Sequence, residues 1–316
     1  MAVVTRGRGE GEVLRGRTTS TSCSTSSLRR GRRGAGRCRC RARGGKPPPP
    51  ETGEEGGTTT AVTCDLVLSS GFLAFASHAG FLKGCEGMRI KGIMGTSAGA
   101  ITGSLFSAGY SAEDILRETT RDPPWKLLRP NLFFWEGLFC LDAVVERMRE
   151  LLPATFEELT EVDFACAVLS SEGAYTVVDS GALPEAVVAS AAIPFLFKKV
   201  EIPGREDEGP FADGGARERV GLAPWRERVR ASRSGDPPLA LVHLIQRSFG
   251  PFSGNDDMSS VQETHYSQVT SPKSGVTLLS LGDYEKQYEE ARARTKARIA
   301  DLGQQAPRRV KSKKKV

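Results

Sequence analysis

The stretch that decides the fold runs from Asp65 to Ala112 and reads DLVLSSGFLAFASHAGFLKGCEGMRIKGIMGTSAGAITGSLFSAGYSA. Apolar runs alternate with small residues along it, which predicts strand, loop, helix, strand, sharp turn and helix. At its centre lies a G-x-S-x-G sequence, GTSAG, with a strand-like run before it and a helix-like run after it. In that context the serine, Ser97, sits in a strained strand-to-helix turn with its hydroxyl exposed. We therefore predict that Ser97 is a nucleophile and not a small residue in an ordinary turn.

The glycines on either side of Ser97 complete this predicted nucleophile elbow. Gly95 and Gly99 carry no side chain that would clash in the tight turn. The first N–H groups of the following helix favour negative charge that develops nearby.

Two further motifs follow in the second half of the chain. Asp213 begins an Asp-Gly-Gly sequence, and Ala189–Pro194 (ASAAIP) precedes it. With the opening stretch, these motifs make residues 64–247 resemble a patatin-like phospholipase domain. Domains of this family begin with a strand and a glycine-rich loop, continue through a helix into G-x-S-x-G, and carry Asp-Gly-Gly or Asp-Gly-Ala near their end.

The resemblance implies a fold, an activity and a set of site residues. The fold is a three-layer α/β structure with a central, mostly parallel sheet and helices on both faces. The activity is that of a serine lipid acyl hydrolase, which cleaves ester-linked fatty acids from phospho- or galactolipids without a metal or organic cofactor. A serine hydroxyl needs a base, and the resemblance assigns that role to Asp213, with Gly214 and Gly215 completing its motif.

A Ser-His-Asp triad is the competing arrangement. The chain order Ser97, Asp213 and then His243 or His265 permits an α/β-hydrolase triad. However, Ser97 follows only the second predicted strand, where that fold would place several. His243 lies inside the apolar run LALVHLI, which favours a buried structural role, and His265 lies in a polar segment. These positions favour the Ser–Asp dyad.

The first loop departs from the family pattern of Gly-Gly-Gly-x-Arg/Lys-Gly. Here it reads SGFLAF over Ser70–Phe75, with one glycine and no basic residue. The resemblance implies that the backbone N–H groups of Gly71 and Phe72 form the oxyanion hole. Backbone donors need no particular side chain, but Phe72 must then tolerate the torsion angles of the loop. The altered loop leaves open a catalytically impaired protein that binds acyl lipids without turnover.

Residues 122–140, DPPWKLLRPNLFFWEGLFC, contain three prolines, two tryptophans and three phenylalanines without a clear period. They fill a core, or they form an apolar flap at the mouth of the site that contacts lipid. The second alternative implies peripheral contact with a membrane.

The remaining patterns predict alternating strands and helices, which is typical of a parallel sheet. Polar residues 255–274 predict a loop. Strands are expected at 63–69, 89–95, 164–169, 174–178, 195–202 and 239–245, and helices at 74–86, 97–109, from 111, and at 141–152, 183–192 and 284–302. The four cysteines of this region, Cys64, Cys85, Cys140 and Cys166, have no metal-ligand spacing and predict free thiols.

Charge is unevenly distributed along the chain. Residues 1–46 hold twelve arginines and one lysine against two glutamates, and residues 307–316 hold six basic residues. The part between holds 25 basic and 36 acidic residues, which excludes a nucleic-acid-binding surface on the body. We expect a disordered basic leader and linker (1–60), a hydrolase domain (61–250), a loop and amphipathic helix packed on it (251–306), and a basic tail (307–316). The Arg- and Ser/Thr-rich leader predicts a transit peptide to the chloroplast, with mitochondrion or cytoplasm as the alternatives.

Overall fold

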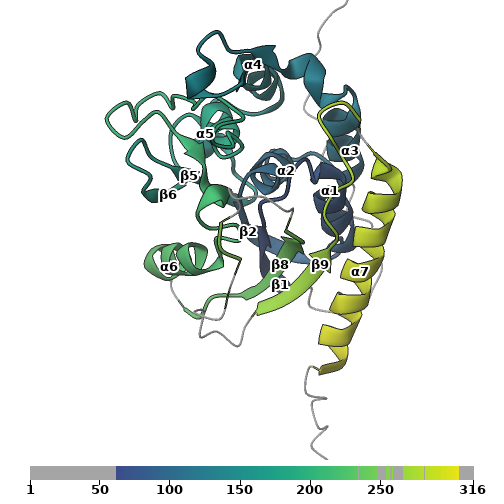
Figure 1. The fold of residues 1–316 in the computed structure, drawn as a ribbon. Helices are drawn as coiled ribbons and strands as arrows, with labels where there is room; N and C mark the ends of the chain where they lie inside the picture. Colours follow the sequence, from purple (N-terminus) through teal and green to yellow (C-terminus); the bar gives the residue numbers. More distant parts are fainter. Residues whose placement is uncertain are drawn as a thin grey trace, which may run out of the picture. The chain divides into compact units, whose positions relative to one another are not determined.

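A seven-stranded sheet forms the centre of the structure (Figure 1). The computed structural model describes residues 62–233, 235–247, 254–256, 258, 266–280 and 282–305. The predicted leader, the basic tail and His265 lie outside the described residues.

The strand order is β6-β5-β2-β1-β8-β9, and β7 also pairs with β5. Five strands run parallel, whereas β6 and β7 run antiparallel to β5. The predicted mostly parallel sheet is therefore confirmed. Its strands are β1 (Thr63–Leu68), β2 (Arg89–Gly95), β5 (Asp163–Leu169), β6 (Tyr175–Val178), β7 (Ala212–Asp213), β8 (Leu239–Ile245) and β9 (Tyr266–Ser271).

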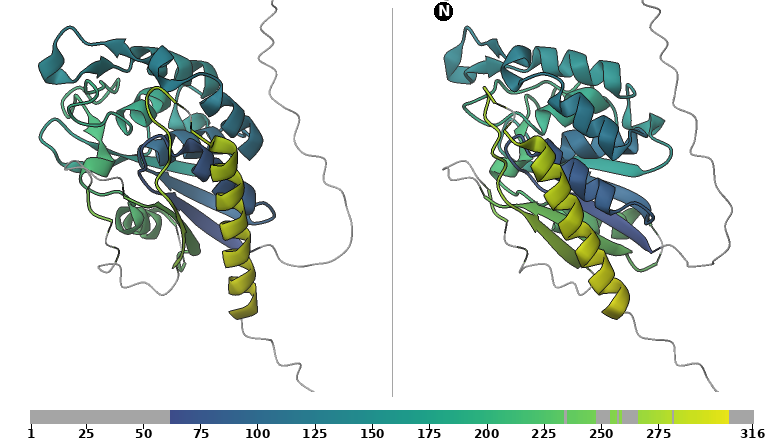
Figure 2. Two further views of the ribbon diagram at one scale, coloured as in Figure 1. Left: turned by 45° about the vertical axis from the view of Figure 1, so that its right-hand side comes forward. Right: turned by 90° about the vertical axis from the view of Figure 1, so that its right-hand side faces the viewer.

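Helices cover both faces of the sheet, as predicted for a three-layer fold. Six helices contribute to one hydrophobic core, and α6 packs on the opposite face. The last helix, α7, packs along α1 (Figure 2). The helices are α1 (Phe75–Gly84), α2 (Ala98–Ser107), α3 (Ala112–Thr120), α4 (Asp142–Leu151), α5 (Leu183–Ala189), α6 (Leu222–Ser232) and α7 (Tyr284–Gln305).

Short elements connect these units. The segment between α3 and α4 contains a small antiparallel pair formed by β3 and β4. The short elements are the 3-10 turns at Pro124–Leu127, Phe134–Glu136, Phe156–Glu158 and Gly214–Ala216, with β3 (Arg129–Pro130) and β4 (Phe139–Cys140).

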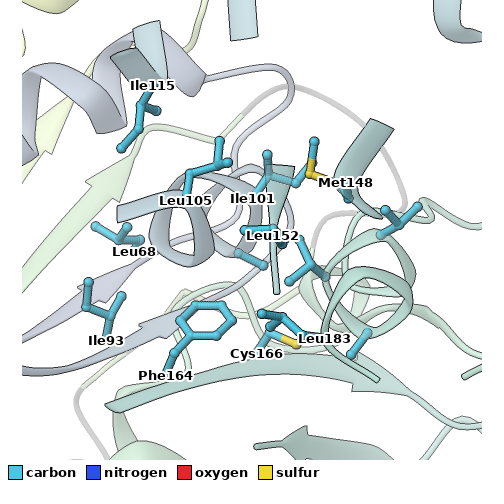
Figure 3. Close-up of a cluster of buried hydrophobic side chains, with 14 of the residues drawn as sticks. Leu68, Ile93, Ile101, Leu105, Ile115, Met148, Leu152, Phe164, Cys166 and Leu183 are labelled. Carbon is cyan, nitrogen blue, oxygen red and sulfur yellow. The ribbon is translucent and has the colours of Figure 1, made fainter. Parts of the chain in front are cut away.

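The period-two alternation of the strands divides the core into two layers. Leu68 and Ile93 point toward the helices of the larger layer, where Phe164 also packs (Figure 3). Their neighbours Val67 and Met94 point to the other face, under α6. Because both faces of the central strands are buried, these strands read as continuous apolar runs in the sequence.

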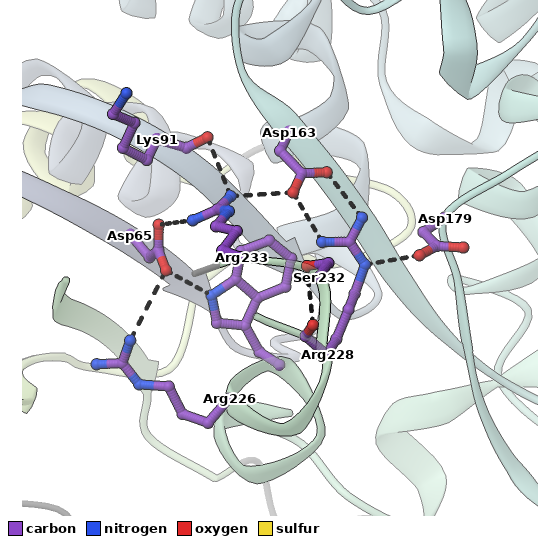
Figure 4. A network of polar contacts seen from close by, with 9 residues as sticks. Asp65, Lys91, Asp163, Asp179, Arg226, Arg228, Ser232 and Arg233 are labelled. Carbon is purple, nitrogen blue, oxygen red and sulfur yellow. Dashed lines mark hydrogen bonds and ion pairs between the residues drawn. The ribbon is translucent and has the colours of Figure 1, made fainter. Parts of the chain in front are cut away.

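A network of ion pairs holds α6 to the sheet (Figure 4). Asp65 of β1 is fully buried and accepts hydrogen bonds from Trp225 Nε1 and Arg233 Nη1, each at 3.1 Å. Asp163 of β5 accepts two bonds of 2.8 Å from Arg228 and one of 2.9 Å from Arg233. Burial raises the pKa of Asp65, while the charge and hydrogen bond of Arg233 oppose this shift. The network therefore compensates the burial of a carboxylate beneath a helix.

Two predicted segments differ from the structure. Residues 195–202 form isolated bridges, between Phe139 and Phe197 and between Val200 and Phe211, and not a strand. The segment has a different partner at each end, so no continuous ladder forms. Conversely, part of the predicted polar loop is β9, whose buried face carries Ser267, Val269 and Ser271. Two of these three residues are polar, so the alternation of buried and exposed residues does not appear as an alternation of apolar and polar residues.

Helix α6 was not predicted, and its composition explains why. Its buried residues are Leu222, Trp225, Arg226 and Val229, which have helical spacing but include an arginine. Among the described residues, no helix is long and apolar enough to cross a bilayer.

Candidate active site

The predicted nucleophile, Ser97, lies between the end of β2 and the start of α2. Its φ of 57° and ψ of −122° are outside the regions that a non-glycine residue normally occupies, and its side chain is buried. A Cβ atom at Gly95 would lie 2.5 Å from Ala100 Cα, and one at Gly99 would lie 2.2 Å from the carbonyl oxygen of Leu68. Both flanking positions therefore require glycine, and the sharp elbow forms as the sequence predicts.

Asp213 lies at the end of β7, a two-residue strand that pairs with β5 beyond the end of β2. Strand β6 pairs with one edge of β5, and β2 and β7 share the other edge: Gly95 of β2 lies opposite Cys166, and Asp213 of β7 lies opposite Val168, two residues further along. The Ser97 hydroxyl lies close enough to the Asp213 carboxyl to lower its pKa. Asp213 Oδ1 also accepts the backbone N–H of Gly215 at 2.7 Å. The sheet topology thus brings together two residues that are far apart in the sequence.

Burial changes the acidity of Asp213. The carboxyl is enclosed by protein, and this desolvation raises its pKa to about 7. The Ser97 hydroxyl, the hydrogen bond from Gly215 and the positive charge of Arg219 act in the opposite direction. A carboxyl with this pKa can accept a proton near neutral pH, where an ordinary aspartate is a very weak base.

Ser190 is a site residue that the sequence reasoning missed. The backbone N–H of Ser97 donates to Ser190 Oγ at 3.0 Å, and Ser190 is fully buried at the end of α5. This bond holds the backbone of the elbow from the α5 side. Ser190 belongs to the ASAAIP motif, which the sequence analysis identified without assigning a role to the serine.

Arg219 is a second missed residue. Its guanidinium donates to the carbonyl oxygens of Ser70 (2.9 Å) and Ile245 (2.8 Å) and to Asp256 Oδ2 (2.8 Å). Its own carbonyl accepts the N–H of Ser70 at 2.7 Å. The buried arginine therefore ties the first loop to the segment that carries Asp213. In sequence it is one of several arginines after the Asp-Gly-Gly motif, so nothing singled it out.

The first loop places its strain on a different residue from the one we expected. Leu73, and not Phe72, has a positive φ of 50°. Among the described residues, no acceptor is found for the backbone N–H groups of Gly71 and Phe72. Ala74 stands at the position where the family pattern has Arg or Lys. Its side chain is fully buried next to α1, so a basic residue there would bury a charge.

An apolar cavity of about 120 Å³ adjoins Ser97. Cavities of this size in proteins accommodate a benzene-sized molecule. The cavity is therefore a mostly apolar compartment beside the elbow serine. The residues that line the cavity are Phe72, Leu73, Phe75, Ser97, Ala98, Ile101, Thr119, Asp122, Pro124, Leu127, Leu128, Leu141, Val144, Val188, Ala191, Ile193, Phe197 and Leu278.

The two histidines that the structure describes form a buried pair. His78 Nε2 donates to the carbonyl oxygen of Ser69 at 3.0 Å, which leaves His78 Nδ1 to accept from His243 Nδ1 at 2.9 Å. His243 Nε2 then accepts the hydroxyl of Ser271 at 2.9 Å. Burial lowers the pKa of both rings, that of His78 to about 3. These contacts give His243 the structural role that its apolar surroundings predicted.

No group of three or more His, Cys, Asp or Glu side chains suited to a metal ion occurs within the described ranges. Cys64, Cys85 and Cys166 are buried free thiols, and Cys140 is half-buried and free.

An elbow serine after a strand of a mostly parallel sheet, near a buried carboxyl and away from both described histidines, fits the patatin-like arrangement and not the α/β-hydrolase triad. A model of the patatin-like phospholipase family matches residues 66–224, half of the chain, and the chain belongs to that family. Membership supports activity as a lipid hydrolase.

Curated relatives match part of their own length. Uncharacterized NTE family proteins of Mycobacterium tuberculosis (strain H37Rv) and Mycobacterium bovis are each 29% identical over 164 residues. The match covers 50% of this chain and 44% of each relative, so the chain spans less than half the length of these proteins.

Solved structures with a similar fold include VipD from Legionella pneumophila and ExoU from Pseudomonas aeruginosa. VipD has a TM-score of 0.43 at 13% identity, covering 77% of this chain and 66% of that chain. ExoU has a TM-score of 0.41 at 14% identity, covering 76% and 53%.

Proposed function

We propose that this chain is a serine lipid acyl hydrolase that cleaves ester-linked fatty acids from phospho- or galactolipids with a Ser97–Asp213 dyad. The strained elbow serine beside the buried carboxyl of Asp213, at the wall of an apolar cavity, carries this proposal. The ester carbonyl would lie next to Ser97, and part of the acyl chain would occupy the cavity. Since such substrates reside in membranes, the proposal includes peripheral contact with a lipid surface.

The reaction has two halves that use the same pair of residues. Ser97 Oγ attacks the ester carbonyl carbon while its proton moves to Asp213, and the carbonyl electron pair moves onto oxygen. The tetrahedral intermediate collapses, and the departing alcohol takes the proton back from Asp213. A water molecule then gives a proton to Asp213 and attacks the acyl-Ser97 carbonyl. Collapse of this second intermediate returns the proton to Ser97 and releases the fatty acid.

The oxyanion needs hydrogen-bond donors. We assign this role to the backbone N–H groups of Gly71 and Phe72, which have no acceptor within the described part of the chain. The N–H of Ala98 is a third donor. It opens α2, where a helix leaves its first N–H groups without internal acceptors, and Ala98 lines the cavity beside Ser97.

Turnover of a water-soluble short-chain ester by the full-length protein tests the proposal. Ser97→Ala and Asp213→Asn should each reduce kcat by at least about a thousand-fold, and the double variant should lose little more, because the pair acts as a unit. Ser104→Ala provides a matched control, since Ser104 is another buried serine of α2 and its hydroxyl donates to the Ile101 carbonyl of its own helix. Equal turnover by the wild type and Ser97→Ala would refute the dyad.

The unusual first loop favours one second candidate, a protein that binds acyl lipids without hydrolysing them. The observation behind it is the positive φ of Leu73 in a loop where the family has glycines. Saturable binding of a fluorescent fatty acid together with no measurable ester turnover would support this candidate and exclude hydrolysis.

A further inference from the structure

An exposed aromatic turn projects from the body of the protein between α3 and α4. Strands β3 and β4 form its stem, and we call residues 129–140 the aromatic hairpin. Leu132 is 90% exposed, Phe134 69% and Trp135 67%, and Phe133 and Leu138 are about half exposed. Figure 2 shows the hairpin, in teal, extending away from the sheet in both views. Contiguous apolar surface of this kind marks an interaction site on a folded protein.

The aromatic hairpin is held in this conformation by specific contacts. The Asn131 side chain donates to the carbonyl oxygens of Phe133 (2.8 Å) and Gly137 (2.9 Å), and it accepts the N–H of Phe133 at 3.2 Å. The Trp135 ring packs edge-on against Phe133 and Phe134. Backbone bonds to residues 195–198 fix the returning strand. The side chains at the tip are therefore presented to solvent by the fold and cannot simply turn inward.

The base of the hairpin is continuous with the cavity beside Ser97. Leu128 and Leu141, the residues on either side of the hairpin, both line the cavity. Phe197 also lines it and forms a bridge with Phe139 of the hairpin. An apolar surface thus runs from the exposed tip down to the compartment next to the elbow serine.

The composition of the hairpin distinguishes between possible occupants of this surface. Trp, Phe and Leu at the tip of a structure are the residues that enter the membrane interface most favourably. The exposed cation Arg129 begins the hairpin, and Lys198, on the adjoining segment, pairs with Glu136 at 3.2 Å. Basic residues at this level suit the lipid headgroups that surround an inserted tip.

We infer that the aromatic hairpin inserts into the interfacial region of a lipid bilayer and seats the mouth of the cavity on the membrane. An acyl chain then passes from the bilayer into the cavity along apolar surface, without crossing water. The inference rests on the proposed function in naming a membrane lipid as substrate. It deepens that function by assigning the surface through which the substrate arrives.

Tryptophan fluorescence of the full-length Ser97→Ala protein tests the insertion directly. The chain has three tryptophans, of which Trp225 is fully buried, so a Trp125→Phe background leaves Trp135 as the exposed reporter. With phosphatidylcholine vesicles, Trp135 emission should shift to shorter wavelength and be quenched by lipids brominated near the top of the acyl chain. A variant that also carries Trp135→Phe corrects for Trp225.

Vesicle flotation measures the energetic contribution of the tip. Leu132→Ser with Phe134→Ser should weaken partitioning by roughly a hundred-fold, about ten-fold for each apolar side chain withdrawn from lipid. Val62→Ser is the matched control, because Val62 is exposed but lies just before β1, outside the hairpin. The double variant should retain wild-type turnover of a soluble short-chain ester and lose turnover of vesicle lipids.

Several results would overturn the inference. Vesicle binding that is unchanged in the double variant, or an unquenched Trp135, would show that another surface meets the membrane. A concentration-dependent dimer that only the double variant loses, without vesicle binding by either, would identify a second copy as the occupant. The proposed function is tested separately, because the binding measurements need no catalysis. Turnover of the soluble ester by Ser97→Ala would refute the proposed function without bearing on membrane insertion.

Discussion

Acidification should switch off ester hydrolysis with a midpoint near pH 7. Burial raises the pKa of Asp213 to about 7, and only the ionised carboxylate can take the proton of Ser97. About a tenth of the protein would carry an ionised Asp213 at pH 6 and about a hundredth at pH 5, so kcat/KM should fall ten-fold per pH unit. An aspartate with an ordinary pKa of about 3.9 would leave the rate flat down to pH 5.

The assay is kcat/KM for a soluble short-chain ester between pH 5 and 9 at constant ionic strength, with near-ultraviolet circular dichroism confirming that the fold persists. The same pH profile is then measured for the variant Arg219→Gln. Removing this positive charge should raise the pKa of Asp213 further and move the midpoint to higher pH, whatever happens to the maximal rate. Arg217→Gln, at an exposed arginine two residues away, should leave the midpoint in place. A midpoint of the pH profile near pH 4, or a midpoint that is unchanged in Arg219→Gln, would refute the assignment of Asp213 as a buried base.

Four more outcomes follow from the same contacts. The folded pKa of Asp213 lies above its unfolded value, so the contribution of Asp213 to stability is present below about pH 4 and is lost as pH rises through 7. At pH 8, Asp213→Asn should therefore raise the free energy of unfolding, measured by urea titration, by up to about 4 kcal/mol, and it should abolish turnover. The opposite sign holds for the buried histidines, whose folded pKa values lie below their unfolded values, that of His78 at about 3. In the Asp213→Asn background His78 alone should lower the free energy of unfolding by about 2 kcal/mol between pH 6.5 and pH 5, His243 should add to this loss, and His78→Gln should remove the His78 part. Ser190→Ala leaves the buried N–H of Ser97 without its acceptor and should cost about 1–3 kcal/mol of stability, with Ser190→Thr restoring part of it. We also propose that residues 1–60 direct import into a chloroplast; a fluorescent reporter carrying them should enter isolated plastids and be shortened, and a reporter that stays outside would remove this proposal.

The parts of the fold that sequence predicted are those that local patterns specify. Strands β1, β2 and β8 are short apolar runs between polar residues, and the elbow around Ser97 needs glycines on both sides for steric reasons alone. The resemblance added Asp213, which no local pattern would have connected with a serine more than a hundred residues away.

The parts that sequence did not predict depend on tertiary contacts. Ser190 contributes through one hydrogen bond to the elbow and Arg219 through bonds to loop carbonyls, so each matters only once distant segments meet. The shifted pKa of Asp213 likewise arises from enclosure by the whole domain. Within residues 122–140, Leu128 packs against the core and lines the cavity, whereas Leu132 at the tip is exposed; contact of this segment with lipid stays a prediction.

Ser97 and Asp213 follow or end strands that pair with the same edge of β5, and this has a consequence for how the protein responds to heat. Their separation is set by the register in which β2 and β7 pair with successive residues of β5, and not by the reach of surface loops. Loosening of the hairpin or of the helix ends would therefore leave the pair in register. Loss of the pair requires the strands themselves to separate, which in a domain of this kind is a cooperative event. The reacting pair should stay aligned up to the temperature at which the sheet melts.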